Sequence, residues 1–274
     1  HALGRPAWPM RDPAAFAREG YARNAIAYRC VRLIAEAAAS APMQVGPHDH
    51  PLARLLARPN PEQTGVELLE AFYGHLQVAG NAYLEAASIG EDAPSELYVL
   101  RPDRMSVVPG ADGWPVGWEH RVGSNVRRFE RDPISNDAPI LHLKLFNPTD
   151  DHYGLSPMEA AAFSIDIHNA GGAWNKALID NAARPSGALV FTGVGGADRL
   201  SEEQFQRLKS ELEDMHVGAA NAGPPMLLEG GLEWRPMSLS PSDMDFTEAK
   251  HSAARDIALA LGVPPMLLGI PGDN

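Results

Sequence analysis

Hydrophobic residues recur every three or four positions over residues 21–40. Ile26, Cys30 and Ala37 fall on one side at this spacing, which predicts an amphipathic helix. Cys30 is the only cysteine of the chain, so an intramolecular disulfide is excluded. Because free cysteines are commonly buried, we expect Cys30 to be a small core side chain and not a nucleophile.

Two further helices are predicted in the next forty residues. A short helical turn covers residues 50–56, and Pro59-Asn60-Pro61 ends it. Thr64-Gly65-Val66-Glu67 has the form of a capping box and begins a helix that runs to about Val78. Gly80-Asn81 follows, and both residue types tolerate the left-handed conformation that closes a helix.

From Ala82 to His142 the hydrophobic period changes to two, which is typical of strands. Turn-forming residues such as those of the stretch 109–113 separate the short apolar segments. The segments predicted to be strands are Tyr83–Glu85, Leu97–Leu100, Met105–Val108, Val116–Val122 and Ile140–Leu143. Together they predict a small antiparallel β unit.

The helical period returns at Ser156-Pro157-Met158-Glu159, a helix cap with proline at the first helical position. The helix predicted from there to about Ala183 would be roughly 40 Å long at about 1.5 Å per residue. Gly171-Gly172 interrupts its middle. Since glycine costs stability inside a helix, we expect a bend or a close helix crossing at this point.

The remaining chain predicts a small insertion and a second long helix. The insertion has a strand at 188–191, a helix from Ser201 to about His216, and a strand pair formed by 225–229 and 232–236. The last helix is capped by 240–243 and ends at Gly262. The fold class is therefore α+β: a mixed unit to about Gly154, then two long helices that enclose an inserted α/β unit.

Charge restricts the function that this fold can have. The chain of 274 residues carries 23 Lys and Arg against 35 Asp and Glu, a net charge of −12. From Ser156 onward there are 16 acidic and 8 basic residues, so that part contributes −8. Such a surface disfavours tight binding to DNA phosphates. The longest stretch without charge, residues 257–272, is too short and too broken by glycine and proline to span a membrane.

Catalytic motifs are largely lacking in the sequence. It contains no Walker A phosphate loop, no G-x-S-x-G and no H-E-x-x-H, so we expect no enzymatic activity and no cofactor. Asp150-Asp151-His152 could bind a hard cation, and His48 and His50 could add imidazole ligands. A metal-dependent hydrolase built on these residues is one alternative, and a solvated loop ahead of the helix cap is the simpler interpretation.

Five short motifs follow one another along the chain. They are His50-Pro51-Leu52 through Pro59-Asn60-Pro61, Gly80-Asn81-Ala82-Tyr83, Tyr153-Gly154-Leu155-Ser156-Pro157-Met158-Glu159-Ala160-Ala161, Asn181-Ala182-Ala183-Arg184-Pro185-Ser186-Gly187 and Gly262-Val263-Pro264-Pro265-Met266-Leu267-Leu268-Gly269. They occur in the order found in portal proteins of long-tailed phages, and the chain resembles that family over nearly its whole length. The composition, rich in alanine, also suits a prophage or gene transfer agent.

The resemblance implies a portal fold and a ring, usually of twelve copies, at one vertex of the capsid. Residues 1–155 would form the wing, residues 156–185 the first stem helix and residues 186–238 the clip. Residues 239–262 would form the second stem helix, and residues 263–274 would begin a truncated tunnel loop. We also expect segments of the whole protein to be missing at both ends of this chain.

The resemblance further implies a role without catalysis in DNA packaging and ejection. The expected partners are other copies of the chain, double-stranded DNA in the channel, the terminase large subunit, the head–tail adaptor and the major capsid protein, with no membrane. The protein would be assembled in the bacterial cytoplasm and reside in the virion. A non-portal adaptor protein of the capsid or tail remains the second alternative.

Three sets of residues are predicted to carry this function. Stem packing is assigned to Gly171, Gly172, Trp174 and Leu178, because small residues allow close approach between helices. The clip partner surface is assigned to Glu202, Glu203, Glu213 and Glu229. The tunnel loop facing DNA is assigned to Gly269, Ile270, Pro271, Gly272, Asp273 and Asn274.

Overall fold

The computed structural model describes residues 12–46, 50–88, 94–180, 187–191, 201–207, 210, 232–236 and 245–270. The chain divides into two compact units, each considered by itself. The first comprises His1–Ile167 and His251–Asn274, and the second comprises His168–Lys250. The mixed fold of helices and small antiparallel sheets agrees with the α+β prediction.

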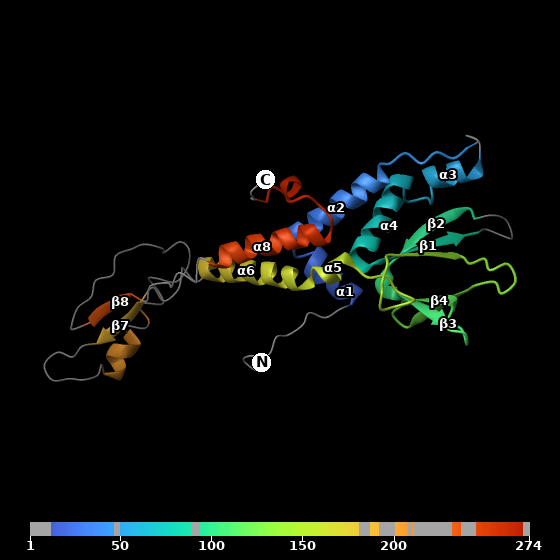
Figure 1. Cartoon of the computed structure of the whole chain (residues 1–274). Helices are drawn as coiled ribbons and strands as arrows, with labels where there is room; N and C mark the ends of the chain where they lie inside the picture. Colours follow the sequence, from blue (N-terminus) through green and yellow to red (C-terminus); the bar gives the residue numbers. More distant parts are fainter. Residues whose placement is uncertain are drawn as a thin grey trace. The chain divides into compact units, whose positions relative to one another are not determined.

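The first unit begins with helical segments. They are α1 (Pro13–Ala15), a π-helical turn η1 (Phe16–Tyr21), α2 (Ala25–Ala39), α3 (Pro51–Ala57) and α4 (Gly65–Ala79). The sequence predicted α2, α3 and α4 but not α1 or η1. The Asn24 side chain accepts hydrogen bonds from the Ile26 and Ala27 amides at 3.1 and 3.0 Å, so α2 starts later than predicted. Thr64 and Glu67 form the predicted capping box of α4. Helices α2 and α4 pack against each other (Figure 1).

The predicted antiparallel β unit consists of two three-stranded sheets. The first sheet has the order β2-β1-β6, and the second has the order β3-β4-β5. The strands are β1 (Asn81–Ala87), β2 (Glu96–Leu100), β3 (Met105–Pro109), β4 (Pro115–Val122), β5 (Asn125–Glu130) and β6 (Ile140–Lys144). Strand β5 was missed because Phe129 is its one buried side chain, so it lacks a clear apolar alternation.

Alternation along β1 places hydrophobic side chains on both faces of the first sheet. Ala82 packs with Phe72 and Leu76 of α4 on one face. Tyr83 points to the other face, into the core between the two sheets. That core contains Tyr83, Met105, Trp118, Phe129 and Ile140. The first sheet is therefore the middle layer between α4 and the second sheet.

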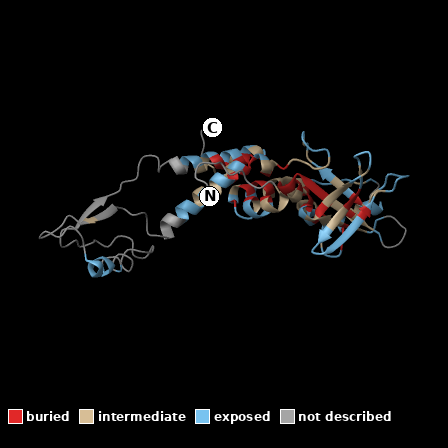
Figure 2. Ribbon diagram, turned by 90° about the horizontal axis from the view of Figure 1, so that it is seen from below, coloured by how far each residue is buried: buried red, intermediate tan, exposed pale blue. Residues whose placement is uncertain are grey.

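The long helix predicted from Pro157 is divided into α5 (Pro157–Ala160) and α6 (Ala162–Asp180). Between them Ala161 has ψ near −1°, and its amide bonds to the carbonyls of both Glu159 and Pro157, which tightens the turn. The apolar stripe continues across the break, since Met158, Ala161 and Ile165 are all buried. They pack with α8 (Asp245–Ala260), whose Ile257 and Ala258 have no exposed surface. Figure 2 shows this buried core in red.

In the second unit, β7 (Gly187–Phe191) pairs with β8 (Leu232–Pro236) in antiparallel register. The sequence analysis predicted that residues 232–236 pair with residues 225–229. Residues 225–229 lie outside the described residues. Residues 202–207 are helical, and Ser201 and Gln204 cap that helix reciprocally, as predicted. Within the described residues, no helix combines the length and the hydrophobicity needed to cross a bilayer.

Candidate functional site

Two of the resemblance motifs meet where the first sheet joins the start of the helical core. The buried Asn81 side chain donates to the Ala79 carbonyl at 2.8 Å and to the Gly154 carbonyl at 3.2 Å. Its Oδ1 atom accepts from the Gly154 amide at 2.8 Å and lies 3.0 Å from His142 Nε2. One side chain thus ties together the end of α4, strand β6 and the loop before α5. We call this cluster, Asn81, His142, Gly154 and Ser156, the motif node.

Ser156 completes the motif node from the helical side. Its hydroxyl donates to the Val78 carbonyl at 2.7 Å and accepts from the Met158 amide at 3.0 Å. The residue is 2% exposed, so these bonds satisfy polar groups that water cannot reach. The helix cap predicted from the sequence is therefore also a tertiary contact with the last turn of α4.

Gly154 of the motif node and the neighbouring Gly80 allow two backbone segments to approach closely. Gly80 has φ +70°, and a Cβ atom there would lie 2.6 Å from the Gly154 carbonyl oxygen. A Cβ atom on Gly154 would overlap the Gly80 carbonyl oxygen and lie 2.6 Å from the Leu145 amide nitrogen. These motif residues are therefore explained by packing and backbone geometry.

His142 is held neutral in the motif node. Its ring stacks on Tyr83 with centroids 4.2 Å apart. Burial, and to a smaller extent the nearby Lys144 ammonium, lower the pKa of His142 to about 4. With one ring proton, Nε2 donates to Asn81 Oδ1. Nothing in the sequence pattern indicates this role, because His142 lies in an ordinary strand pattern.

The candidate metal residues serve the backbone of their own loop. Asp150 Oδ1 accepts from the amides of His152 and Tyr153 at 2.7 and 2.9 Å, which lowers the pKa of that carboxyl. His50 Nδ1 accepts from the Leu52 amide and caps α3, whereas His48 lies outside the described residues. Across the described ranges, no three His, Cys, Asp or Glu side chains gather as metal ligands would. The geometry gives the hydrolase alternative no support.

The predicted stem residues lie on α6, and its two glycines are not closely packed against other atoms. A Cβ atom on Gly171 would meet the Lys250 Cβ at an ordinary 3.9 Å, and one on Gly172 would meet nothing within 4 Å. The expected close crossing within the chain is therefore not at Gly172. Phe163 and Trp174 of the same helix are 57% and 49% exposed. The side chain of Leu178 lies outside the described residues.

The other predicted site residues are described in part. Glu202 and Glu203 are exposed, and Glu202 accepts a hydrogen bond from Gln206 at 2.9 Å. Gly269 has φ +66° and closes the short helix η5 (Pro265–Leu268). The Ile270 amide donates to the Pro265 carbonyl, and its side chain packs on the helical core. Glu213, Glu229 and residues 271–274 lie outside the described residues.

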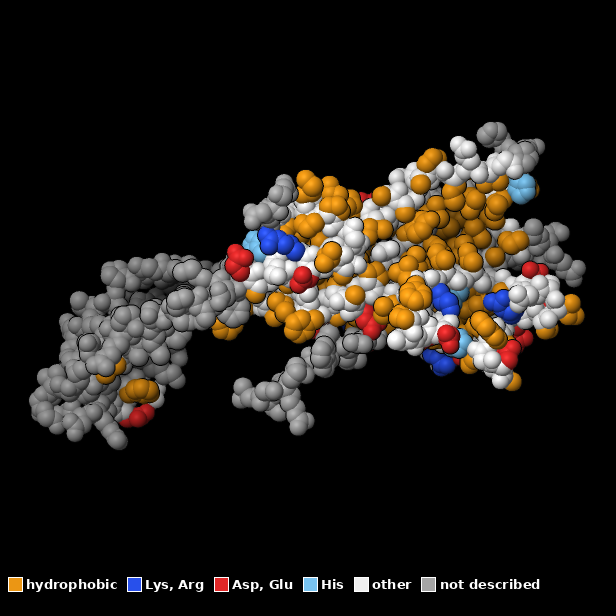
Figure 3. Space-filling model, in the orientation of Figure 1, with side chains coloured by type: hydrophobic (Ala, Val, Ile, Leu, Met, Phe, Trp, Pro, Cys, Tyr) orange, Lys and Arg blue, Asp and Glu red, His pale blue; other side chains and the backbone are white. Residues whose placement is uncertain are grey.

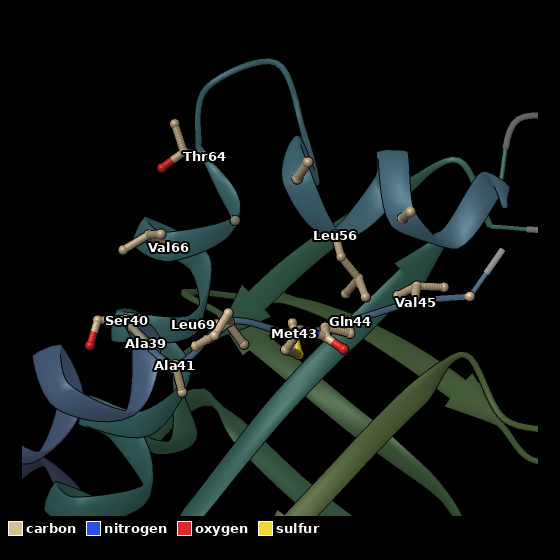
Figure 4. Close-up of a pocket in the computed structure, with 15 residues that line it drawn as sticks. Ala39, Ser40, Ala41, Met43, Gln44, Val45, Leu56, Thr64, Val66 and Leu69 are labelled. Carbon is tan, nitrogen blue, oxygen red and sulfur yellow. The ribbon is translucent and has the colours of Figure 1, made fainter. Parts of the chain in front are cut away.

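An apolar groove that sequence reasoning missed lies between α2, α3 and α4. Its volume is about 710 Å³. The extended segment Ala41–Gly46 crosses it, with Leu56 on one side and Val66 and Leu69 on the other (Figure 4). Figure 3 shows hydrophobic side chains gathered on this face of the molecule. Met43 and Val66 are 52% and 54% exposed, so the groove has open hydrophobic walls.

Comparison with solved structures finds, among others, two that match nearly the whole of this chain. A chain of the neck of the native gene transfer agent particle, computed with C12 symmetry, is 55% identical, with a TM-score of 0.74. The match covers 99% of this chain and 74% of that one. An HK97-family phage portal protein from Corynebacterium diphtheriae has the same fold, with a TM-score of 0.63 at 16% identity. That match covers 98% of this chain and 82% of the other.

Relatives found by sequence point to the same family as the solved structures. An uncharacterised protein of Rickettsia bellii (strain RML369-C) is 44% identical over 93% of this chain and 67% of its own length. The portal protein of Enterobacteria phage HK97 is 28% identical over 88% of this chain and 57% of its own length. This chain thus spans little more than half of the HK97 protein. Since the family model for phage portal proteins matches residues 25–274, the chain belongs to the phage portal protein family.

Proposed function

We propose that this chain is the portal subunit of a virion or gene transfer agent particle and that about twelve copies form a ring around a DNA channel. The observation that carries the proposal is the 55% identity, over 99% of the chain, to a chain from a particle neck with C12 symmetry. Portal proteins are structural, so the ring works without catalysis. The particle vertex is its proposed location, after assembly in the bacterial cytoplasm.

Within the ring, residues 1–155 form the wing, 156–185 and 239–262 the stem helices, 186–238 the clip and 263–274 the start of the tunnel loop. Exposed apolar residues on α6 support this assignment of the stem. Phe163, Ile167 and Trp174 follow at spacings of four and seven, which places them along one side of a helix. A ring interface joins two different surfaces of neighbouring copies, and such a stripe suits one of them.

The acidic character from Ser156 onward fits a channel through which DNA must slide. Clustered cations would release counterions and hold the phosphates, whereas excess carboxylates do not. We assign the exposed Glu202 and Glu203, together with Glu213 and Glu229, to docking of the terminase motor and later of the head–tail adaptor. The major capsid protein surrounds the wing in this arrangement.

The ring is tested by native mass spectrometry and electron microscopy of the full-length protein. We expect a closed ring of about twelve copies with a central hole. The variant Trp174→Glu should lower ring yield at least tenfold, while Trp114→Glu, at another exposed tryptophan, should leave it unchanged. A full-length protein that stays monomeric at high concentration and in particles would refute the portal proposal and favour an adaptor.

The clip assignment has its own test. Charge reversal of Glu202 and Glu203 should reduce DNA packaging or tail attachment in particles that still contain intact rings. Reversal of Glu62, which is exposed at the start of the α4 region, is the matched control. Normal packaging and tail attachment by the Glu202/Glu203 variant would show that these residues belong to a solvated helix surface and do not bind a partner.

A further inference from the structure

A second hollow, separate from the apolar groove, lies between η1, α2 and α4. Its volume is about 310 Å³, which falls within the range of roughly 300–1,000 Å³ known for small-molecule pockets. Its lining includes Tyr21 of η1, Arg32 and Ala35 of α2, and one face of α4 from Glu67 to Val78. Among the described residues, it shares no lining residue with the apolar groove. We call it the three-helix hollow, and it combines small apolar walls with polar groups.

Small residues leave the floor of the three-helix hollow unfilled. Ala35 and Ala71 contribute only methyl groups, and Gly74 contributes no side chain. Because glycine inside a helix lowers stability, a helical glycine is commonly explained by a close contact or a positive φ. A Cβ atom on Gly74 would meet nothing within 4 Å, and Gly74 lies inside α4 without a positive φ. Packing does not explain this glycine, whereas a hollow that stays open does.

The polar groups of the three-helix hollow have unused hydrogen-bond acceptors. Glu67 uses its Oε2 atom in the capping box of α4, and Glu70 uses its Oε1 atom to bond to Arg32. Among the described residues, the second oxygen of each carboxylate accepts no hydrogen bond. The Tyr21 hydroxyl and the His75 ring also have no hydrogen-bond partner within that part of the chain. A ligand that only donates hydrogen bonds would therefore find partners here.

The lining of the three-helix hollow has an excess of negative charge. Two carboxylates, those of Glu67 and Glu70, and one guanidinium, that of Arg32, line it. Arg32 also bonds at 2.6 Å to Glu36, which lies outside the lining, so its positive charge is shared with a further carboxylate. Burial lowers the pKa of His75, so its ring is neutral at pH 7 and adds no positive charge. The hollow therefore favours a ligand with a cationic end.

We propose that the three-helix hollow binds an alkylammonium group, with its carbon chain against Ala71 and Gly74 and its nitrogen beside Glu67 and Glu70. An ammonium has three donors and no acceptor, which matches the unused acceptors. Gly74 and Glu70 are four positions apart, about 6 Å along the helix, a distance that a four-carbon stem like that of lysine bridges. A free aliphatic amine and a lysine side chain of a second copy both present this group. The proposal does not depend on ring assembly, so it can fail while the portal function holds.

Ligand-observed saturation-transfer NMR of the full-length protein with n-butylammonium tests the site. We expect a Kd in the millimolar range, because so small a ligand has few atoms that contribute to binding. The probes n-butanol and butanoate have the same number of carbon atoms without the positive charge, and they should bind at least about tenfold more weakly. Equal binding of the three probes would overturn the proposal, and so would a complete lack of n-butylammonium binding.

Variants separate the three-helix hollow from general attraction to an acidic surface. Gly74→Leu fills the floor with a side chain that favours helix, and it should weaken n-butylammonium binding at least about tenfold. Ala37→Leu, at an exposed position of α2 outside the hollow, should leave binding unchanged. Glu67→Gln still completes a capping box but removes the charge, and it should weaken binding several-fold. Unchanged binding in either Gly74→Leu or Glu67→Gln would overturn the proposal.

Acylation of lysines in the assembled full-length protein distinguishes the two sources of the ammonium group. If a lysine of a second copy occupies the hollow, that lysine should be protected from acetic anhydride and become several times more reactive in Gly74→Leu. If the ligand is a free amine, no lysine should change its reactivity, and added n-butylammonium should still bind to the assembled protein. An assembled protein that neither binds n-butylammonium nor shows a lysine of altered reactivity would overturn the proposal.

Discussion

Replacing Asn81 by alanine should destabilise the first unit, because one side chain satisfies several backbone groups in the motif node. The change removes the acceptor of the Gly154 amide and the donor to the Ala79 carbonyl, which lie 2.8 Å from the amide side chain. A buried polar group left without a partner costs about 1–3 kcal/mol. Allowing for partial relaxation, we expect a loss of about 3 kcal/mol in the free energy of unfolding.

Urea unfolding of the full chain measures this loss. With an m value of about 2 kcal/mol/M, the midpoint of the first unit's transition should fall by about 1.5 M while m stays constant. Asn125→Ala, at an exposed position of β5, should change the free energy by less than about 0.5 kcal/mol. A loss below about 1 kcal/mol for Asn81→Ala would refute the argument that the motif node holds the sheet to the helical core.

The variant Asn81→Asp keeps the size of the side chain and removes only its hydrogen-bond donor, so it separates the effect of lost hydrogen bonds from that of a cavity. The carboxylate keeps an acceptor for the Gly154 amide but places an oxygen opposite the Ala79 and Gly154 carbonyls. At pH 7 this variant should be at least as unstable as Asn81→Ala, because two acceptors then face each other. Equal stability of Asn81→Asp and the unaltered chain would show that the amide nitrogen contributes nothing.

Three other measurements follow from the same geometry. The pKa of His142 is about 4 in the folded chain and near 6.5 in an unfolded one, so the unfolded state binds more protons between these values. Stability should therefore fall as pH drops from about 6.5 to 4, and His142→Gln should weaken that dependence; an identical pH profile would contradict it. Gly80→Ala should lower the free energy of unfolding by more than about 3 kcal/mol, because the new Cβ clashes with Gly154 and φ is positive. Gly113→Ala, with φ +85° and open space around it, should lower it by about 1 kcal/mol. Thermal unfolding measures both losses, and equal losses would be inconsistent with the close approach at Gly80. Burial raises the pKa of Cys30 to about 11, so iodoacetamide should leave it unmodified in the folded chain at pH 8, and rapid labelling would show that the core opens readily.

Much of the fold could be predicted from the sequence because many of its signals are local. The capping box at Thr64, the left-handed closure at Gly80 and the buried stripe through Cys30 each depend on residues within about one or two helical turns. The resemblance motifs also identified the family. Strand β5 could not be predicted in this way, since its register comes from pairing with β4 and its side chains are mostly exposed.

The candidate site was predicted less well, because its residues act through distant partners. Asp150-Asp151-His152 suggested a metal from adjacency alone, but the Asp150 carboxylate bonds to its own loop. The apolar groove joins Ala39 of α2, Leu56 of α3 and Val66 of α4, whose common surface exists only after these helices have packed. Spacing along the chain contains no signal of such a surface.

The sequence by itself determined the α+β class, most helix boundaries and the family, because periodicity, caps and short motifs are properties of neighbouring residues. Only the tertiary structure shows what the motifs containing Asn81 and Gly154 do. Asn81 and Gly154 are 73 positions apart, and their hydrogen bonds form only when the sheet meets the helical core. Long-range backbone contacts of this kind depend on how elements pack, and packing is not encoded in any one segment.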